Sequence, residues 1–216
     1  ILMTETLKKD RKFIILNPKK EISNKSLKYF NNLVKKRSKG EPVAYLVKKK
    51  YFWKYEFIVS KDVLIPRPDT EVIVEQVLDL TKNKQRLSLL DIGIGSGCIL
   101  LSILKDKKNF FGTGIDISKK SLIISKINGQ NLDIINRLKL IKSDIDNFHF
   151  GKYDLIISNP PYIKKNKLKY LERDVIGFEP LKALNGGIDG LSEINKVINR
   201  SSELIKKNGI LILEIN

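Results

Sequence analysis

Short apolar runs and helix-like periodic stretches alternate along the chain from residue 87 onward. The apolar runs are nearly continuous, which is typical of strands that are buried on both faces of a sheet. The predicted strands are 87–93, 110–117, 137–144, 153–159 and 210–215, and the predicted helices are 97–107, 118–129 and about 190–208, the last ending at Gly209. This alternation predicts an α/β fold whose doubly wound, mostly parallel sheet carries helices on both faces.

The first 60 residues follow a different pattern. Residues 1–40 read as helical fragments, in which Ser26 is predicted to cap a helix that stops before Gly40. The apolar face of that helix consists of Leu27, Phe30, Leu33 and Val34. Residues 41–60 alternate aromatic and polar side chains, which predicts a β-hairpin. A small helical segment and a hairpin linker are therefore expected to precede the sheet.

Two prolines, Pro66 and Pro68, interrupt the chain in the stretch "IPRPDTE". A helix is predicted to follow them, with Asp69 or Thr70 as its cap. Its apolar cover is expected to come from Val72, Val74, Val77, Leu78 and Leu80.

Composition narrows the class of protein. The chain has 216 residues, of which 42% are hydrophobic and 30% charged, and this suits one α/β domain with a small addition. We find no run of about 18 apolar residues and no signal-peptide pattern, so we expect no membrane contact and a cytoplasmic location. Cys98 and His149 are the only cysteine and histidine, which excludes an internal disulfide and predicts no metal site.

The formal net charge is +17, which raises the question of a nucleic-acid partner. Lysines are spread through nearly every segment, with local clusters at 48–50 and 164–169. This spread favours a compositional drift of the whole chain over a functional basic face, although an acidic or ribosome-associated partner stays possible.

A glycine-rich turn, "DIGIGSG" (91–97), lies between the first predicted strand and its helix. Gly93, Gly95 and Gly97 allow a sharp turn and a close approach of the backbone to a ligand. The dinucleotide fingerprint would need a glycine or alanine where Cys98 stands. The observed spacing instead resembles the first motif of methyltransferases that use S-adenosylmethionine.

Two carboxylates end the next two strands. Asp116 can accept hydrogen bonds from the ribose hydroxyls of an adenosine ligand, and Asp144 can accept one from the adenine amino group. The alternatives are a helix cap for Asp116 and a solvated strand end for Asp144. Polar groups at successive strand ends mark the edge at which open α/β sheets bind ligands.

The fourth predicted strand runs into "NPPY" (159–162) on the same edge. This pattern resembles the motif of methyltransferases that modify planar nitrogens, whose lone pair is delocalised into the adjoining π system. The side-chain oxygen of Asn159 and the carbonyl of Pro160 can accept the two N–H bonds of such a nitrogen. The prolines keep both acceptors rigid, and Tyr162 can pack on the flat face of the group.

These stretches together resemble the release factor glutamine methyltransferase family (HemK/PrmC) over almost the whole chain. The resemblance extends to "KKRSKGEPVAYL" (35–46), "FWKYEFIVSKDVLIPRPDTE" (52–71), "NPPYI" (159–163) and "FEPLKALNGGIDGL" (178–191). It implies a Rossmann-like class I methyltransferase fold and transfer of a methyl group from S-adenosylmethionine to a glutamine side-chain amide. In the family, that glutamine belongs to the Gly-Gly-Gln motif of peptide chain release factors.

The resemblance also assigns residues. The cofactor-binding residues are expected to be Gly93, Ile94, Gly95, Ser96, Gly97, Asp116, Asp144, Ile145 and Asn159. Residues Asn159, Pro160, Pro161 and Tyr162 are expected to bind the substrate glutamine, with Asn159, Pro160 and Tyr162 as the catalytic groups. Family members often carry an aromatic residue at the position of Ile145, so packing rather than stacking is expected there.

The implied domains are a partial helical substrate-recognition domain (1–40), the hairpin linker (41–65) and the methyltransferase domain (66–216). The chain starts with Ile1 rather than methionine and stops just after a predicted strand, which suggests a fragment lacking parts of both ends. We expect a monomer with a release factor as partner and no direct contact with nucleic acid. The alternatives are a ribosomal-protein glutamine or an adenine N6-type nucleic-acid methyltransferase, and a non-catalytic protein that keeps the fold.

Overall fold

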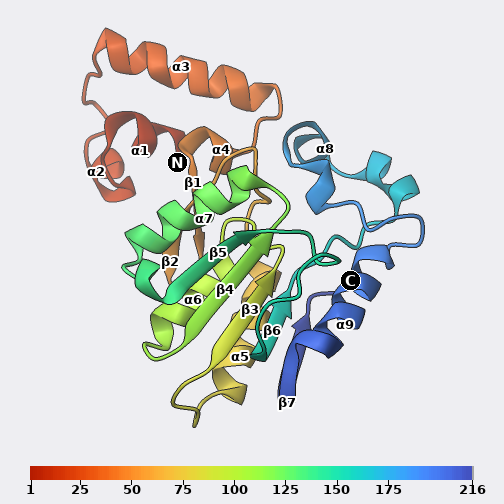
Figure 1. Ribbon diagram of the computed structural model, residues 1–216. Helices are drawn as coiled ribbons and strands as arrows, with labels where there is room; N and C mark the ends of the chain where they lie inside the picture. Colours follow the sequence, from red (N-terminus) through yellow and green to blue (C-terminus); the bar gives the residue numbers. More distant parts are fainter. Residues whose placement is uncertain (216) are drawn as a thin grey trace.

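The structure is a computed structural model, and it describes residues 1–215. Short helices come first and an open sheet with flanking helices follows, and a small hairpin lies between the two parts (Figure 1). The N-terminal helices are α1 (Leu2–Leu7), α2 (Arg11–Leu16), α3 (Asn24–Ser38) and α4 (Val43–Val47). The hairpin pairs β1 (Lys49–Phe52) with β2 (Tyr55–Ile58) in antiparallel register.

The sheet has the strand order β5-β4-β3-β6-β7, and every neighbouring pair is parallel. Its strands are β3 (Ser88–Ile92), β4 (Phe111–Asp116), β5 (Leu138–Lys142), β6 (Tyr153–Ser158) and β7 (Ile205–Leu213). Its longer helices are α5 (Glu71–Leu80), α6 (Cys98–Asp106), α7 (Lys119–Asn131) and α9 (Ser192–Leu204). The shorter elements are η1 (Pro68–Thr70), η2 (Ile135–Arg137), η3 (Lys165–Tyr170), α8 (Arg173–Phe178) and η4 (Leu181–Ala183). The predicted doubly wound α/β fold is confirmed.

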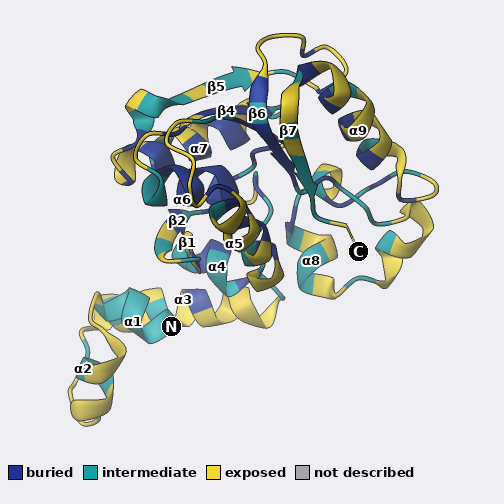
Figure 2. Cartoon of the chain, turned by 90° about the horizontal axis from the view of Figure 1, so that it is seen from below, coloured by how far each residue is buried: buried dark blue, intermediate teal, exposed yellow. Residues whose placement is uncertain are grey.

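Two apolar clusters cover the two faces of the sheet. Side chains of α5, α6 and α7 pack on one face, and the other face packs against α9 and Phe148. The central strands β3 and β6 are buried on both faces, and Figure 2 shows most of β6 in dark blue. This burial explains why both strands read as continuous apolar runs in the sequence.

Three predicted element boundaries are wrong. The predicted hairpin at 41–60 is real only from β1 to β2, because Val43–Val47 form a helical turn that buries Tyr45 and Leu46. The helix attributed to a Ser26 cap starts at Asn24, and its cap is Ser23, whose hydroxyl accepts the Ser26 backbone N–H. The last predicted helix ends at Leu204 rather than near Gly209.

Strand pairing explains the early end of α9. Ile205 already pairs with Tyr153, and the ladder then skips to Ile210 opposite Leu155. The irregularity contains Asn208 at a φ of 64°, which allows the chain to bulge before it rejoins the sheet. Since sheet pairing is a tertiary interaction, helical periodicity could not show where this helix ends.

The apolar faces of α3 and α5 also differ from the prediction. In α3 only Leu33 is fully buried, while Leu27 and Val34 are exposed. Helix α5 buries Ile73, Val74 and Val77, and it exposes two residues of its predicted cover, Val72 and Leu80.

Candidate active site

The ends of three strands bring the predicted site residues to one edge of the sheet. Ile92 at the end of β3 pairs with Ile115 of β4 on one side and with Ser158 of β6 on the other. The glycine turn, Asp116 and the NPPY segment therefore leave the sheet at the same level. The hydroxyl of Ser158 donates a hydrogen bond of 2.7 Å to the Ile92 carbonyl, which fixes the two strand ends to each other.

The glycine turn has backbone angles that side chains rarely adopt. Gly93, Gly95 and Gly97 have φ values of 78°, 56° and 83°. A Cβ at Gly93 would meet nothing within 4 Å, whereas one at Gly97 would lie 2.7 Å from Leu101. Gly97 is thus needed for packing of the following helix, while Gly93 faces open space in which a ligand can approach the backbone.

The side chains within this turn point into the protein. Ile94 is buried against Gly114, and Ser96 is buried near Asn128, whose amide donates to the Ser96 carbonyl at 2.9 Å. The Ser125 hydroxyl donates to the Gly95 carbonyl at 2.7 Å. The Ile94 N–H donates to the Ile115 carbonyl and the Ile94 carbonyl accepts the Gly97 N–H, so Ile94 shapes the turn. Helix α7 holds the turn in place through Ser125 and Asn128, which the sequence did not single out.

Asp116 is tied to the same turn. Its carboxylate accepts the backbone N–H of Gly95 at 3.0 Å and that of Ser118 at 2.8 Å. Burial raises the pKa of Asp116, and the two N–H bonds oppose the shift. The N-cap of α7 is Ser118, whose hydroxyl accepts the Ser121 N–H, so the alternative role of Asp116 as the cap of this helix is wrong.

Asp144 and Ile145, which follow β5, differ in exposure: Asp144 is exposed and Ile145 is buried. The exposed Asp144 carboxylate accepts the backbone and side-chain N–H groups of Asn147, and these bonds lower its pKa. Ile145 is only 7% exposed and belongs to the apolar cluster that contains Phe148 and Ile115. Ile145 thus packs into the protein's own apolar cluster and offers little side-chain surface to a ligand.

Asp91 is a buried acid that the sequence analysis did not assign to the site. It starts the "DIGIGSG" stretch, is 2% exposed, and one of its carboxylate oxygens has no hydrogen-bond partner among the described residues. Burial raises the pKa of Asp91 to about 7, opposed by the Leu100 backbone N–H and assisted by the nearby Asp116 carboxylate. An unpaired, buried carboxyl beside a glycine turn is a common feature of ligand sites.

The raised pKa predicts a pH dependence of stability. Below about pH 4 the Asp91 carboxyl is protonated in the folded and in the unfolded chain. Between about pH 4 and pH 7 only the folded chain keeps this proton. Its contribution to the free energy of unfolding is therefore lost as the pH rises through 7. We compare the free energies of unfolding of Asp91→Asn and the wild type in urea, without cofactor. The difference between them should favour the variant more at pH 8 than at pH 5. An equal difference at both pH values would contradict the shift.

Asn159 follows β6 directly and is half-buried. Its side-chain nitrogen donates a hydrogen bond of 3.3 Å to the hydroxyl of Thr70. Thr70 was predicted as a possible cap of α5; it occupies the cap position, but its side chain makes no cap hydrogen bond. Within residues 1–215, neither the Asn159 side-chain oxygen nor the Pro160 carbonyl accepts a hydrogen bond. Two adjacent acceptors are thus free for a ligand.

Tyr162 is also half-buried. Burial raises the pKa of the Tyr162 hydroxyl, and the Glu214 carboxylate at the end of the sheet raises it further. The Arg67 guanidinium opposes this shift and the Asp69 carboxylate adds to it, so the Tyr162 hydroxyl stays protonated.

A second segment, "LNGGIDG" (184–190), lies against the backbone of the NPPY loop. The Ile163 N–H donates to the Leu184 carbonyl at 3.1 Å, and the Gly186 N–H donates back to the Ile163 carbonyl at 2.9 Å. A Cβ at Gly186 would lie 2.7 Å from the Tyr162 Cα and 2.8 Å from the Pro161 carbonyl oxygen. The loop therefore has its shape because a glycine lets two backbones touch.

An ion pair between the buried Glu179 and the partly exposed Arg67 joins two of the stretches on which the family resemblance rests. Glu179, which is 5% exposed, accepts the Ile65 backbone N–H at 3.1 Å and pairs with the Arg67 guanidinium. "IPRPDTE" is thereby fixed to "FEPLKALNGG", although they are more than a hundred residues apart in sequence. Together they frame the NPPY loop, with Thr70 at Asn159 and Gly186 at Tyr162.

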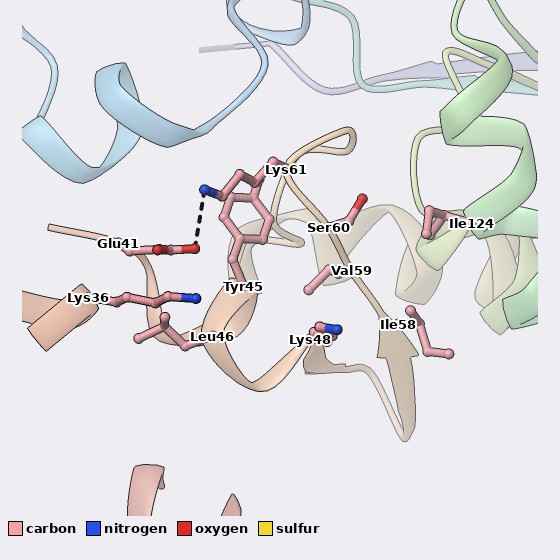
Figure 3. Close-up of a pocket in the computed structure, with 10 residues that line it drawn as sticks. All are labelled: Lys36, Glu41, Tyr45, Leu46, Lys48, Ile58, Val59, Ser60, Lys61 and Ile124. Carbon is pink, nitrogen blue, oxygen red and sulfur yellow. Dashed lines mark ion pairs between the residues drawn. The ribbon is translucent and has the colours of Figure 1, made fainter. Parts of the chain in front are cut away.

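A cavity of about 440 Å³ lies elsewhere, between the N-terminal helices, the hairpin and α7 (Figure 3). Tyr45, Val59 and Ile124 contribute apolar walls, and a Lys61–Glu41 ion pair lies at its edge. None of the predicted site residues lines this cavity. The cavity therefore lies outside the candidate active site.

Comparison with known proteins identifies the class first. A family model described as "Methyltransferase small domain" matches residues 69–176. Among solved structures, the hMettl16 catalytic domain in complex with MAT2A 3'UTR hairpin 6 is similar with a TM-score of 0.57 at 16% identity, over 69% of this chain and 58% of that one. The chain thus has the class I fold of methyltransferases that use S-adenosylmethionine. Within residues 1–215, no helix is both long and apolar enough to cross a membrane.

The family follows from closer relatives. A model described as "PrmC N-terminal domain" matches residues 1–47. The release factor glutamine methyltransferase of Buchnera aphidicola subsp. Acyrthosiphon pisum is 38% identical over 99% of this chain and 76% of its own length. That of Clostridium acetobutylicum is 39% identical over 100% of this chain and 76% of its own length. The chain belongs to the release factor glutamine methyltransferase family.

Proposed function

We propose that this chain transfers a methyl group from S-adenosylmethionine to the side-chain amide nitrogen of a glutamine, the one in the Gly-Gly-Gln motif of peptide chain release factors. The observation that carries the proposal is the pair of acceptors left unpaired among the described residues, the Asn159 side-chain oxygen and the Pro160 carbonyl, on consecutive residues directly after β6. Two acceptors match the two N–H bonds of a primary amide. The names of the relatives support the release factor as the source of that amide.

The residues around the glycine turn fit the cofactor. Gly93 faces open space, Ile94, Gly95, Ser96 and Gly97 shape the turn, and the Asp116 carboxylate stands at its side and holds the Gly95 N–H. Asp144 and Ile145 follow the neighbouring strand and are proposed to border the adenine. The orphaned Asp91 oxygen is a further sign that a polar group of a ligand belongs near this turn. When bound, S-adenosylmethionine supplies a methyl group that is activated by a positively charged sulfur.

The chain's own groups are proposed to overcome the low reactivity of the amide nitrogen. The Asn159 oxygen and the Pro160 carbonyl accept its two N–H bonds, which orients the nitrogen lone pair away from both acceptors and towards the methyl group. Proline at 160 and 161 limits the motion of these acceptors, and Tyr162 packs on the flat face of the amide. The new N–C bond forms as the S–C bond breaks, and one N–H proton leaves to solvent.

The N-terminal helices are proposed to contact the release factor. We assign residues 1–40 to this recognition part, 41–65 to the linker and 66–216 to the methyltransferase domain; the matched N-terminal model extends slightly further, to residue 47. We also propose a monomeric, cytoplasmic enzyme with no direct nucleic-acid contact.

Labelling of a release factor tests the function. The chain is incubated with methyl-labelled S-adenosylmethionine and a purified release factor, and then with a variant whose Gly-Gly-Gln glutamine is replaced by alanine. We expect label on the first protein and none on the second. Label on RNA, on DNA or on a ribosomal protein instead would overturn the proposed substrate.

Asp116→Ala tests the cofactor assignment. Removing this carboxylate leaves the N–H groups of Gly95 and Ser118 without their acceptor and removes the proposed ribose contact. We expect the affinity for S-adenosylhomocysteine to fall at least about 10-fold in calorimetry, the scale of one charged hydrogen bond. An unchanged affinity in a variant that still unfolds cooperatively would exclude Asp116 from the cofactor site.

A further inference from the structure

Thr70 places a hydroxyl at Asn159 that the helix itself does not need. The residue is 3% exposed and ends η1, which continues directly into α5, so Thr70 has helical backbone angles (φ −65°, ψ −18°) and its side chain is not placed to cap the helix. No cap hydrogen bond is present, and the hydroxyl instead accepts the side-chain N–H of Asn159 across 3.3 Å. The hydroxyl therefore serves the contact with the proposed catalytic loop and not the start of the helix.

The position of Thr70 is fixed by contacts of the residues that precede it in the chain. Its backbone N–H donates to the Arg67 carbonyl at 3.2 Å, and the Arg67 side chain is paired with the buried Glu179. Glu179 also holds the Ile65 backbone N–H. The segment that carries Thr70 is therefore anchored on both sides of Pro66, which limits the movement of the Thr70 hydroxyl.

A fixed partner matters because a side-chain amide has two different ends. Asn159 can accept an N–H of the substrate only with its oxygen, and then its nitrogen must find an acceptor elsewhere. Thr70 accepts at that nitrogen, so the oxygen stays free on the substrate side. Without the Thr70 hydroxyl, the half-buried Asn159 nitrogen would lack a hydrogen-bond acceptor. A rotation of the Asn159 side chain that brings its nitrogen to another acceptor would then lower the free energy.

We propose that Thr70 is a positioning residue for methyl transfer, which holds the Asn159 side chain so that its oxygen meets the substrate amide. The proposal rests on the proposed function only in naming a glutamine amide as that group. Thr70 itself touches neither cofactor nor substrate in this assignment. It should influence the chemical step and leave cofactor binding unchanged.

Kinetics of Thr70→Val and Thr70→Ser test the proposal. Valine keeps the shape and removes the acceptor, and we expect kcat on the release factor to fall about 10-fold or more, the scale of one hydrogen bond in a preorganised site. Affinity for S-adenosylhomocysteine should stay within about 2-fold in calorimetry, and Thr70→Ser should recover most of kcat. A kcat of Thr70→Val equal to that of the wild type would overturn the proposal.

Thr81→Val is the matched control. Thr81 is equally buried, at 3% exposure, and lies at the other end of α5, where its hydroxyl donates to the Val77 carbonyl. The Thr81→Val variant loses a buried hydroxyl next to the same helix but leaves the proposed site unchanged, so its kcat should equal that of the wild type. An equal loss of kcat in both valine variants would assign the effect to α5 stability and overturn a positioning role.

Two further measurements separate this inference from the proposed function. If Thr70 acts through Asn159, adding Thr70→Val to Asn159→Ala should lower kcat no further, and additive losses would contradict the proposal. The Asn159 side-chain NH₂ signal in NMR, identified by its absence in Asn159→Ala, should shift in Thr70→Val and return in Thr70→Ser. That signal needs no substrate, so it decides the role of Thr70 even where the wild type fails to label a release factor.

Discussion

Asn159→Ala is expected to lower kcat for methyl transfer to a release factor by about 10²–10³-fold, or about 3–4 kcal/mol, as when one preorganised transition-state partner is lost. The variant removes an acceptor for the substrate N–H and leaves the Pro160 carbonyl as the only one. The barrier rises because the amide nitrogen is then held by one bond and can turn its lone pair away from the methyl group. Turnover is measured with labelled S-adenosylmethionine at saturating release factor.

Cofactor binding separates this effect from general damage. Asn159 donates to Thr70 rather than into the glycine turn, so affinity for S-adenosylhomocysteine should stay within about 10-fold of the wild type. Asn195→Ala is the control, since Asn195 is exposed on α9 and alanine favours a helix there. Normal turnover by Asn159→Ala would exclude the paired-acceptor mechanism.

Gly186→Ala is expected to abolish most of the activity through the shape of the NPPY loop. The new Cβ would lie within 3 Å of the Tyr162 Cα and of two carbonyl oxygens, those of Pro161 and Gly190. These are backbone atoms, so no rotamer change can relieve the contact, and the loop has to move. A displacement on the order of 1 Å at a reacting group can cost about 10²-fold in rate. Such overpacking should also lower the free energy of unfolding by about 1–3 kcal/mol.

Gly177→Ala provides the same chemical change in a place with room for it. A Cβ at Gly177 in α8 would meet nothing within 4 Å, so turnover should be unchanged and the helix slightly stabilised. Activity and urea unfolding are measured for both variants. Wild-type turnover by Gly186→Ala would mean that the NPPY loop tolerates a shift, and that segment 184–190 does not set its geometry.

Much of the catalytic edge could be predicted from local sequence. The turn at 93–97 needs glycines at positive φ, and the NPPY segment ends a strand whose apolar run is visible without any partner. The carboxyl ends of parallel strands share one edge, so predicting the strands already predicts that Gly93, Asp116 and Asn159 lie together. The buried Asp91 was open to the same reasoning, because a carboxyl at the end of a strand buried on both faces has no solvent to reach.

The ends of the helices and the contacts between distant segments were harder to predict from the sequence. The end of α9 at Leu204 depends on the pairing of Ile205 with Tyr153, and the single turn of α4 depends on burial of Tyr45 and Leu46. Thr70 has the sequence context of a helix cap, and only its contact with Asn159 shows another use. In each case the deciding partner is distant in sequence and leaves no periodic signal.

The sequence by itself determined the α/β class, the strand ends at which the predicted site residues lie, and the type of group that we propose for them. These follow from hydrophobic period, from glycine and proline stereochemistry, and from the hydrogen-bonding capacity of Asn159, all of which are local properties. The tertiary structure alone decided how the site is held together. The contacts of Thr70 with Asn159, of Glu179 with Arg67, and of Gly186 with Tyr162 each join separate segments. Such contacts depend on packing between segments, which no local pattern specifies.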